Sequence, residues 1–142
     1  MTENEIGSIV VDTAIEVHRQ LGPGLLETVY EAVPAHELSI KGLHVQRQVP
    51  IVIRFKSMTF DEAFRADIVV ENKIIIELKS VELLSNAHRK QIQTYLRLTG
   101  LKLGYLLNFG AAFMKDGIVR AVNGIEDSPV PLRVSAAPRE NS

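Results

Sequence analysis

The spacing of apolar residues changes along the chain, and each change marks a predicted helix or strand. Apolar residues recur every three to four positions over 5–20, over 26–33 and over 86–99, which is typical of helices with one buried face. Between 45 and 79 the spacing becomes two, which is typical of β-strands, and two further runs of strand length follow at 102–109 and 117–123. This order of elements predicts an α/β fold in which helices flank a central mixed β-sheet.

Capping and helix-breaking residues place some element boundaries more closely. Thr2 followed by Glu5 forms a capping box at the start of the first helix, and Gly22-Pro23-Gly24 separates that helix from the second. Pro34 predicts a kink or an early end in the second helix. Pro50 predicts that the first strand lies at a sheet edge or contains a bulge.

The segment RADIVVENKIIIELKS, residues 65–80, predicts a β-hairpin with one apolar face. A loop of residues 71–73 pairs apolar residues on that face: Ile68 with Ile76, Val70 with Ile74, and Ala66 with Leu78. The opposite face then pairs Asp67 with Glu77, and Arg65 with Lys79. A two-residue loop would move Asp67 to the apolar face and bury an unpaired carboxylate, so we reject that register.

Like charges that face each other across a hairpin are destabilising, so the second face needs an explanation. In one interpretation, the diagonals Arg65–Glu77 and Asp67–Lys79 are surface ion pairs, each worth ~0 to 1 kcal/mol. In the other, Asp67 and Glu77 converge on a divalent cation, and Lys79 beside them holds a water or a phosphate oxygen. The hairpin alone leaves both interpretations open.

Composition narrows the class of protein. With 142 residues, 46% of them hydrophobic and 23% charged, the chain is expected to form one globular domain over residues 1–126, followed by a flexible tail over 127–142. The absence of cysteine excludes disulfides and thiolate zinc sites. No signal peptide or membrane-length apolar run is found, so we expect a cytoplasmic protein with no membrane partner. A net charge of -1 means that binding to nucleic acid would need a local cationic patch.

Two more polar patterns accompany the hairpin. Gly24, Glu27 and Tyr30 form a G-x-x-E-x-x-Y pattern at the start of the second predicted helix, and Gln91 and Tyr95 share a stripe on the third. With the hairpin between them, these motifs resemble the GxxExxY proteins, a branch of the PD-(D/E)XK nuclease superfamily, from about residue 6 to 123. Three motifs in the same order are far more specific than any one of them.

The resemblance implies a restriction-endonuclease-like core and a nuclease that uses Mg²⁺ or Mn²⁺. Asp67 and Glu77 resemble the metal ligands of the superfamily, and Lys79 its catalytic lysine. Glu27 would hold a second cation or a metal-bound water, and Gln91 would position the nucleophile or the substrate backbone. The implied partner is nucleic acid, in the first place DNA, and a homodimer is expected because small members of this fold class often pair to span a duplex.

Other interpretations remain open at this stage. Glu27 would also complement the positive end of the second helix, and Gln91 and Tyr95 would also suit the rim of an amphipathic helix. The whole protein would also suit a non-catalytic module that binds nucleic acid or protein, or a subunit of a repair or defence complex.

Overall fold

The computed structural model describes residues 1–125, and the predicted domain end at 126 and tail of 127–142 lie outside them. The elements follow the predicted order, with these bounds: α1 (Glu3–Leu21), α2 (Glu27–Ile40), β1 (Val45–Phe55), β2 (Met58–Val70), β3 (Ile74–Lys79), α3 (Asn86–Thr99), β4 (Leu103–Asn108), the short 3-10 helix η1 (Met114–Gly117) and β5 (Ile118–Val122). None of the helices in this described part combines the length and the apolar content that a membrane crossing needs.

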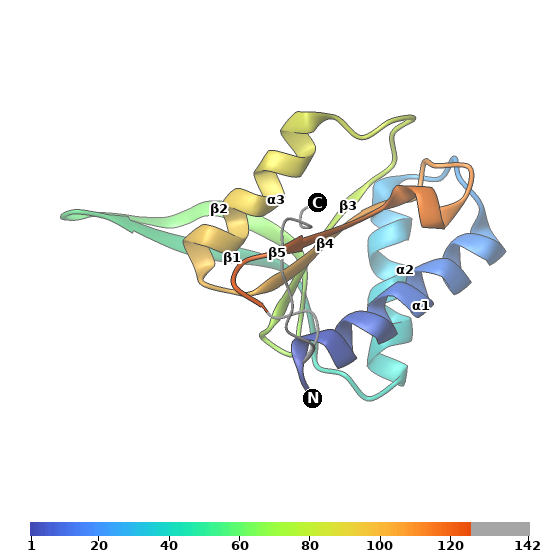
Figure 1. The fold of residues 1–142 in the computed structure, drawn as a ribbon, viewed down its shortest axis with the longest axis horizontal. Helices are drawn as coiled ribbons and strands as arrows, with labels where there is room; N and C mark the ends of the chain where they lie inside the picture. The colour runs from blue at the N-terminus through green and yellow to red at the C-terminus, as the bar shows by residue number, and fades with distance from the viewer. Residues whose placement is uncertain (126–142) are drawn as a thin grey trace, which may run out of the picture.

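The strands form one five-stranded sheet in the order β1-β2-β3-β4-β5. The β3–β4 pair is parallel and the other pairs are antiparallel, so the sheet is mixed, as predicted. β1 lies at the edge of the sheet, where Pro50 lacks the N–H that a second neighbouring strand would need. α1 and α2 cover one face of the sheet and α3 covers the other (Figure 1).

Each face of the sheet has its own apolar core. On the first face, residues of α1 and α2, including Ile6 and Tyr30, pack against Ile68 and Ile76. On the second face, Ile92 and Leu96 of α3 pack against Ile75. β3 and β4 are therefore buried on both sides, which explains why both read as continuous apolar runs in the sequence.

α1 begins as predicted, because the side chains and backbones of Thr2 and Glu5 form the reciprocal bonds of a capping box. The early end predicted for α2 at Pro34 is wrong, since the helix continues to Ile40. Proline removes one backbone hydrogen bond from a helix, and here the buried side chains at Ala35 and Leu38 hold the following turn against the core.

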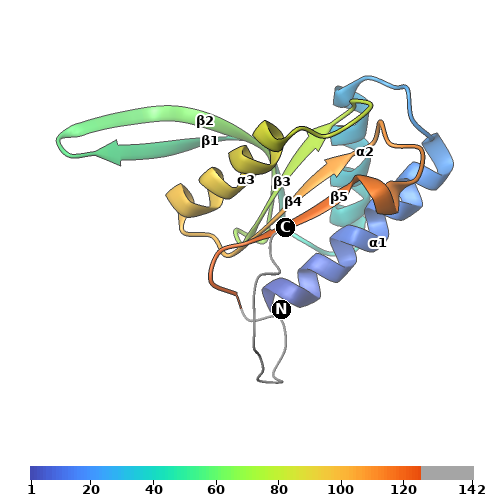
Figure 2. The ribbon, with the colours of Figure 1, turned by 45° about the horizontal axis from the view of Figure 1, so that its top comes forward.

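The β1–β2 hairpin extends well beyond the body of the protein as a two-stranded arm (Figure 2). Phe55 pairs with Met58 across a two-residue turn, in which Lys56 has the positive φ of 55° that the tight hairpin turns require. Residues 52–60 are called the arm tip below.

Candidate active site at the fork between two strands

β2 and β3 pair over a short distance and then separate. The register is the predicted one, because Val70 pairs with Ile74, Val69 with Ile75, and Ile68 with Ile76, and the loop between the strands is 71–73. Beyond Ile76, β3 stays paired with β4 as far as Lys79, whereas β2 continues alongside β1 into the arm. Asp67 and Glu77 lie where the strands part, and we call this place the fork.

The separation corrects two predicted pairings. Ala66 does not continue the apolar face with Leu78, because it packs in the core on the α3 side. Arg65 does not face Lys79, because β2 has left β3 at that point and Arg65 pairs with Pro50 of β1. The guanidinium of Arg65 forms its ion pair with Glu62 at 2.6 Å, so the predicted Arg65–Glu77 diagonal is wrong.

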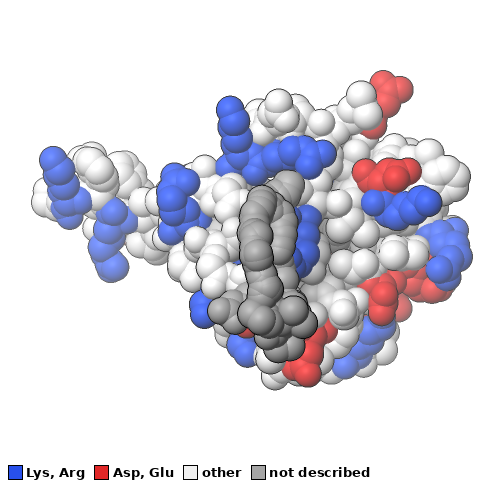
Figure 3. Space-filling model, in the orientation of Figure 1, with Lys and Arg blue, Asp and Glu red and all other residues white. Residues whose placement is uncertain are grey.

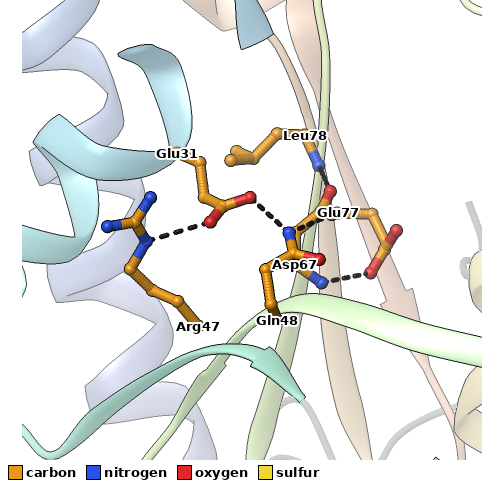
Figure 4. A network of polar contacts seen from close by, with 6 residues as sticks. All are labelled: Glu31, Arg47, Gln48, Asp67, Glu77 and Leu78. Atoms are coloured by element: carbon orange, nitrogen blue, oxygen red, sulfur yellow. Dashed lines mark hydrogen bonds and ion pairs between the residues drawn. The ribbon is translucent and has the colours of Figure 1, made fainter. Parts of the chain in front are cut away.

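The two acids at the fork take over backbone hydrogen bonds that the sheet no longer makes. The Leu78 N–H donates to Oδ2 of Asp67 at 2.9 Å, and the Asp67 N–H donates to Oε2 of Glu77 at 3.0 Å (Figure 4). A buried N–H without an acceptor is costly, so these bonds stabilise the open fork. They also fix the orientation of both carboxylates.

Burial makes the negative charges at the fork unfavourable. Glu77 is only 6% exposed, and its burial, followed by the charge of Asp67, raises its pKa to about 8. Burial also raises the pKa of Asp67, and the N–H of Leu78 opposes this shift. The positive charge of Lys79 lowers the pKa of both acids, so its ammonium group lies within electrostatic reach of each.

A third acid, Glu31 of α2, belongs to the same network (Figure 4). Its carboxylate accepts hydrogen bonds from Nε of Arg47 at 2.9 Å and from Nε2 of Gln48 at 2.6 Å. Nε2 of Gln48 also donates to Oδ1 of Asp67 at 3.3 Å, so one amide connects the two acids. The backbone of Gln48 has a φ of 53°, a strained conformation for a residue other than glycine.

Glu31 was missed in the sequence, although a signal for it exists. It is 8% exposed and lies at helical spacing before buried Pro34, Ala35 and Leu38, so an acid occupies a position of the buried stripe. The negative charge of Glu31 raises the pKa of Asp67 and of Glu77. It therefore contributes to the electrostatics of the fork.

The G-x-x-E-x-x-Y pattern has a structural explanation at two of its three positions. Gly24 has a φ of 106°, which favours glycine, in the turn before α2. The buried Tyr30 donates its hydroxyl hydrogen to the Gly22 carbonyl and accepts from the Leu25 N–H, which ties this turn down. Glu27 is exposed, and its Oε2 accepts from the N–H of Ser80 at 3.3 Å. Glu27 thus reaches the end of β3, next to Lys79, rather than the two acids.

α3 borders the fork on the other face of the sheet. The ring of Tyr95 stacks on Phe64 of β2, with centroids 3.7 Å apart. Burial raises the pKa of the Tyr95 hydroxyl, the charges of Glu77 and Asp67 raise it further, and a hydrogen bond with the Gln91 side chain opposes them. Gln91 is exposed. It is linked to the two acids only indirectly, because it bonds to Tyr95, and the hydroxyl of Tyr95 interacts with the charges of Glu77 and Asp67.

The donor set of the fork fits a hard divalent cation. Within residues 1–125, no group of three or more His, Cys, Asp or Glu side chains is placed to hold a metal. Two carboxylates lie together at the fork, and Mg²⁺ is typically bound by one or two carboxylates together with waters and substrate phosphates. The chemistry of Asp67 and Glu77 therefore fits Mg²⁺ or Mn²⁺.

A family model matches most of the chain. The family model described as PD-(D/E)XK nuclease superfamily matches residues 4–121. The match is at the level of the superfamily, so the GxxExxY branch stays a prediction. Neither the search of curated proteins nor that of solved structures found a match.

Proposed function

Because the chain belongs to the PD-(D/E)XK nuclease superfamily, we propose that it is a metal-dependent nuclease that hydrolyses phosphodiester bonds in nucleic acid. The observation that carries this proposal is the pair of acids at the fork. Asp67 and Glu77 are held by backbone N–H groups, and both have raised pKa values. Burial and the repulsion between the two acids make their charged forms unfavourable, and a divalent cation bound between them would offset that cost.

Asp67 and Glu77 would hold Mg²⁺ or Mn²⁺, in keeping with the general use of divalent metals in this superfamily. Such a cation, when bound, neutralises charge on the scissile phosphate and lowers the pKa of a coordinated water. The protein contributes the placement, because both carboxylates are already oriented by bonds to Leu78 and to the Asp67 backbone.

Lys79 follows Glu77 by two residues on β3, and its positive charge acts on both acids. In our proposal the ammonium group orients the attacking water or neutralises the charge that grows on the phosphate oxygens. Glu27 would orient water at the end of β3, where it already accepts from the Ser80 N–H. Gln91, held by Tyr95, would position the nucleophile or the substrate backbone.

We propose that Glu31 is a positioning residue for the fork. Its bond to Gln48 holds the amide that donates to Asp67, so it acts on the proposed metal ligand through Gln48. Burial is the main cause of the raised pKa of Asp67, and the charge of Glu31 raises it further, which a neutral residue at this position would not do.

The test is cleavage of labelled single-stranded, duplex and branched substrates in Mg²⁺, Mn²⁺ or EDTA. We expect metal-dependent cleavage of at least one substrate, and its loss in Asp67→Asn. Asp116→Asn is the matched control, because it removes the same charge from an exposed position outside the fork and the β1–β2 arm. Tight binding to every substrate without cleavage in any metal would favour the non-catalytic module instead.

A further inference from the structure

The tip of the β1–β2 arm is largely exposed to solvent. Both strands of the arm tip lie outside the two apolar cores, and exposed fractions reach 60% for Phe55, 53% for Met58 and 46% for Phe60. An isolated two-stranded ribbon is marginal in water, and exposed apolar strips of this kind mark binding surfaces. The arm tip is therefore suited to contact something outside the described chain.

The two faces of the arm tip differ. Pairing of Ile53 with Phe60 and of Phe55 with Met58 places these four apolar side chains on one face. Arg54 pairs with Thr59 and points to the other face, and Lys56 lies in the turn. One face of the ribbon is thus apolar, and the turn and the opposite face carry cations.

The charge of the arm tip differs from that of the chain. Residues 52–60 contain Arg54 and Lys56 and no acidic residue, whereas the whole chain has a net charge of -1. Two acids, Asp61 and Glu62, follow directly on β2, and Glu62 is paired with Arg65, so the unpaired cations of this part of the arm lie at its tip. On the face of the arm that Figure 3 presents, Lys and Arg side chains are visible and no Asp or Glu side chain is. This is the local cationic patch that nucleic acid binding requires of a protein without overall positive charge.

The arm is continuous with the proposed active site. β2 carries both Phe60 of the arm tip and Asp67 of the fork, and the stacking of Phe64 on Tyr95 fixes the strand between them. Asp67 lies ten positions after Ser57 in the chain, so the tip is about 33 Å along the strand from the fork. That is close to one turn of B-form DNA, which is about 34 Å long.

We propose that the β1–β2 arm lies in a groove of double-stranded DNA about one helical turn from the bond that is cut. The major groove of B-form DNA admits a two-stranded β-ribbon, whereas that of A-form RNA is too deep and narrow to be read by side chains. The apolar face contacts base edges such as thymine methyl groups, and Arg54 and Lys56 contact phosphates. This inference rests on the proposed nuclease function and names its substrate.

A second copy of the chain is the competing occupant of the arm. Two arms that packed through their apolar faces would leave Arg54 on the outer face and would bring no negative charge to Arg54 or Lys56. Phosphates complement the same cations. The charge of the arm tip thus favours DNA over self-association through this surface.

The first experiment measures binding of the full chain in EDTA to a DNA duplex of about 30 base pairs, between about 50 and 200 mM salt. Arg54→Ala combined with Lys56→Ala should weaken binding at least about tenfold and reduce the slope of log K against log salt by about 2. Phe55→Ala combined with Phe60→Ala should weaken binding without changing that slope. Lys102→Ala combined with Lys115→Ala is the charge-matched control, because both residues are exposed and lie outside the arm.

Binding in EDTA separates this inference from the proposed function. Arm-dependent binding without cleavage in any metal would leave the inference standing and overturn the nuclease. Metal-dependent cleavage together with binding that is insensitive to all four arm substitutions would support the nuclease and overturn the inference about the arm. An equal loss in the control pair, or equal arm-dependent binding to duplex RNA, would overturn the groove assignment. Conversion of a dimer to a monomer by the Phe substitutions, with DNA affinity unchanged, would assign the arm to self-association instead.

Discussion

Glu77 holds the backbone of Asp67 across the fork, through a 3.0 Å bond from the Asp67 N–H to Oε2 of Glu77. The carboxylate of Asp67 in turn accepts from the N–H of Leu78, the residue that follows Glu77. Each acid is therefore anchored to the strand that carries the other. The geometry of the pair depends on both residues, and its electrostatics lead to the predictions below.

Metal binding should stabilise the protein through this pair. Millimolar Mg²⁺ or Mn²⁺ should raise the melting temperature of the wild type, since a ligand that binds the folded state contributes about 2.7 kcal/mol at 100 times its dissociation constant. Asp67→Asn should lose most of that shift in a thermal melt, and the control Asp116→Asn should keep it. Equal shifts in wild type and Asp67→Asn would place metal binding elsewhere.

Stability without metal should fall as the pH rises. The folded-state pKa of Glu77 is about 8, above the ordinary value of 4.5, so the folded state binds this proton more tightly than the unfolded state. That contribution is complete below about pH 4.5 and is lost as the pH rises through 8, at about 1.4 kcal/mol for each unit of pKa difference.

Denaturant unfolding in EDTA at several pH values between about 5 and 9 measures this effect. Glu77→Gln removes the titrating group and can still accept from the Asp67 N–H, so its unfolding free energy should fall much less over the same range. Mg²⁺ should stabilise the wild type more at high pH than at low pH, because its ligands must be deprotonated. Parallel pH profiles for wild type and Glu77→Gln would contradict the raised pKa.

Substitution of Lys79 should distinguish a role in catalysis from a role in substrate binding. Its proposed role is in the transition state, so Lys79→Met should keep substrate affinity within a few-fold at fixed salt while cleavage falls by about two to three orders of magnitude. Single-turnover cleavage and binding in EDTA, measured on the same substrate, test this directly. A large loss of affinity with an unchanged cleavage rate would show instead that Lys79 binds the ground state.

Glu31 and Glu27 offer a matched comparison one helical turn apart on α2. The charge of Glu31 raises the pKa of Asp67 and of Glu77, so Glu31→Gln should lower both and shift the acidic limb of the pH–rate profile to lower pH. It should also cost about 1 to 3 kcal/mol of stability, because Glu31 is buried and accepts from Arg47.

Glu27→Gln should reduce the cleavage rate without moving that limb, since Glu27 bonds to Ser80 and is not among the groups that shift either acid. If the acidic limb moved equally in Glu31→Gln and Glu27→Gln, both glutamates would act on the fork through long-range electrostatics alone, and the specific role of Glu31 would be contradicted.

The sequence by itself determined the order of elements, the mixed sheet and the register of the hairpin. The register follows from local constraints: only a loop of 71–73 places Ile68 against Ile76 and Val70 against Ile74, and strand side chains alternate with a period of two. Asp67 and Glu77 were therefore predicted to face each other without knowledge of the rest of the fold. The G-x-x-E-x-x-Y pattern and the Gln91–Tyr95 stripe were likewise visible in the sequence alone.

Only the tertiary structure decided which hydrogen bonds Asp67 and Glu77 make, how far their pKa values shift, and which other residues contact them. The fork exists because β3 stays with β4 while β2 follows β1, a choice between neighbouring strands that the alternation within β2 does not encode. Glu31 reaches Asp67 through Gln48 because α2 packs beside the hairpin, and the raised pKa of Glu77 results from burial by elements far apart in the chain. The arm could not be predicted from the sequence for the same reason. Val49 and Phe55 are both apolar residues of an alternating strand, yet Val49 packs against the body of the protein and Phe55 is exposed. A period of two gives the direction of each side chain, and only packing decides whether anything lies in that direction.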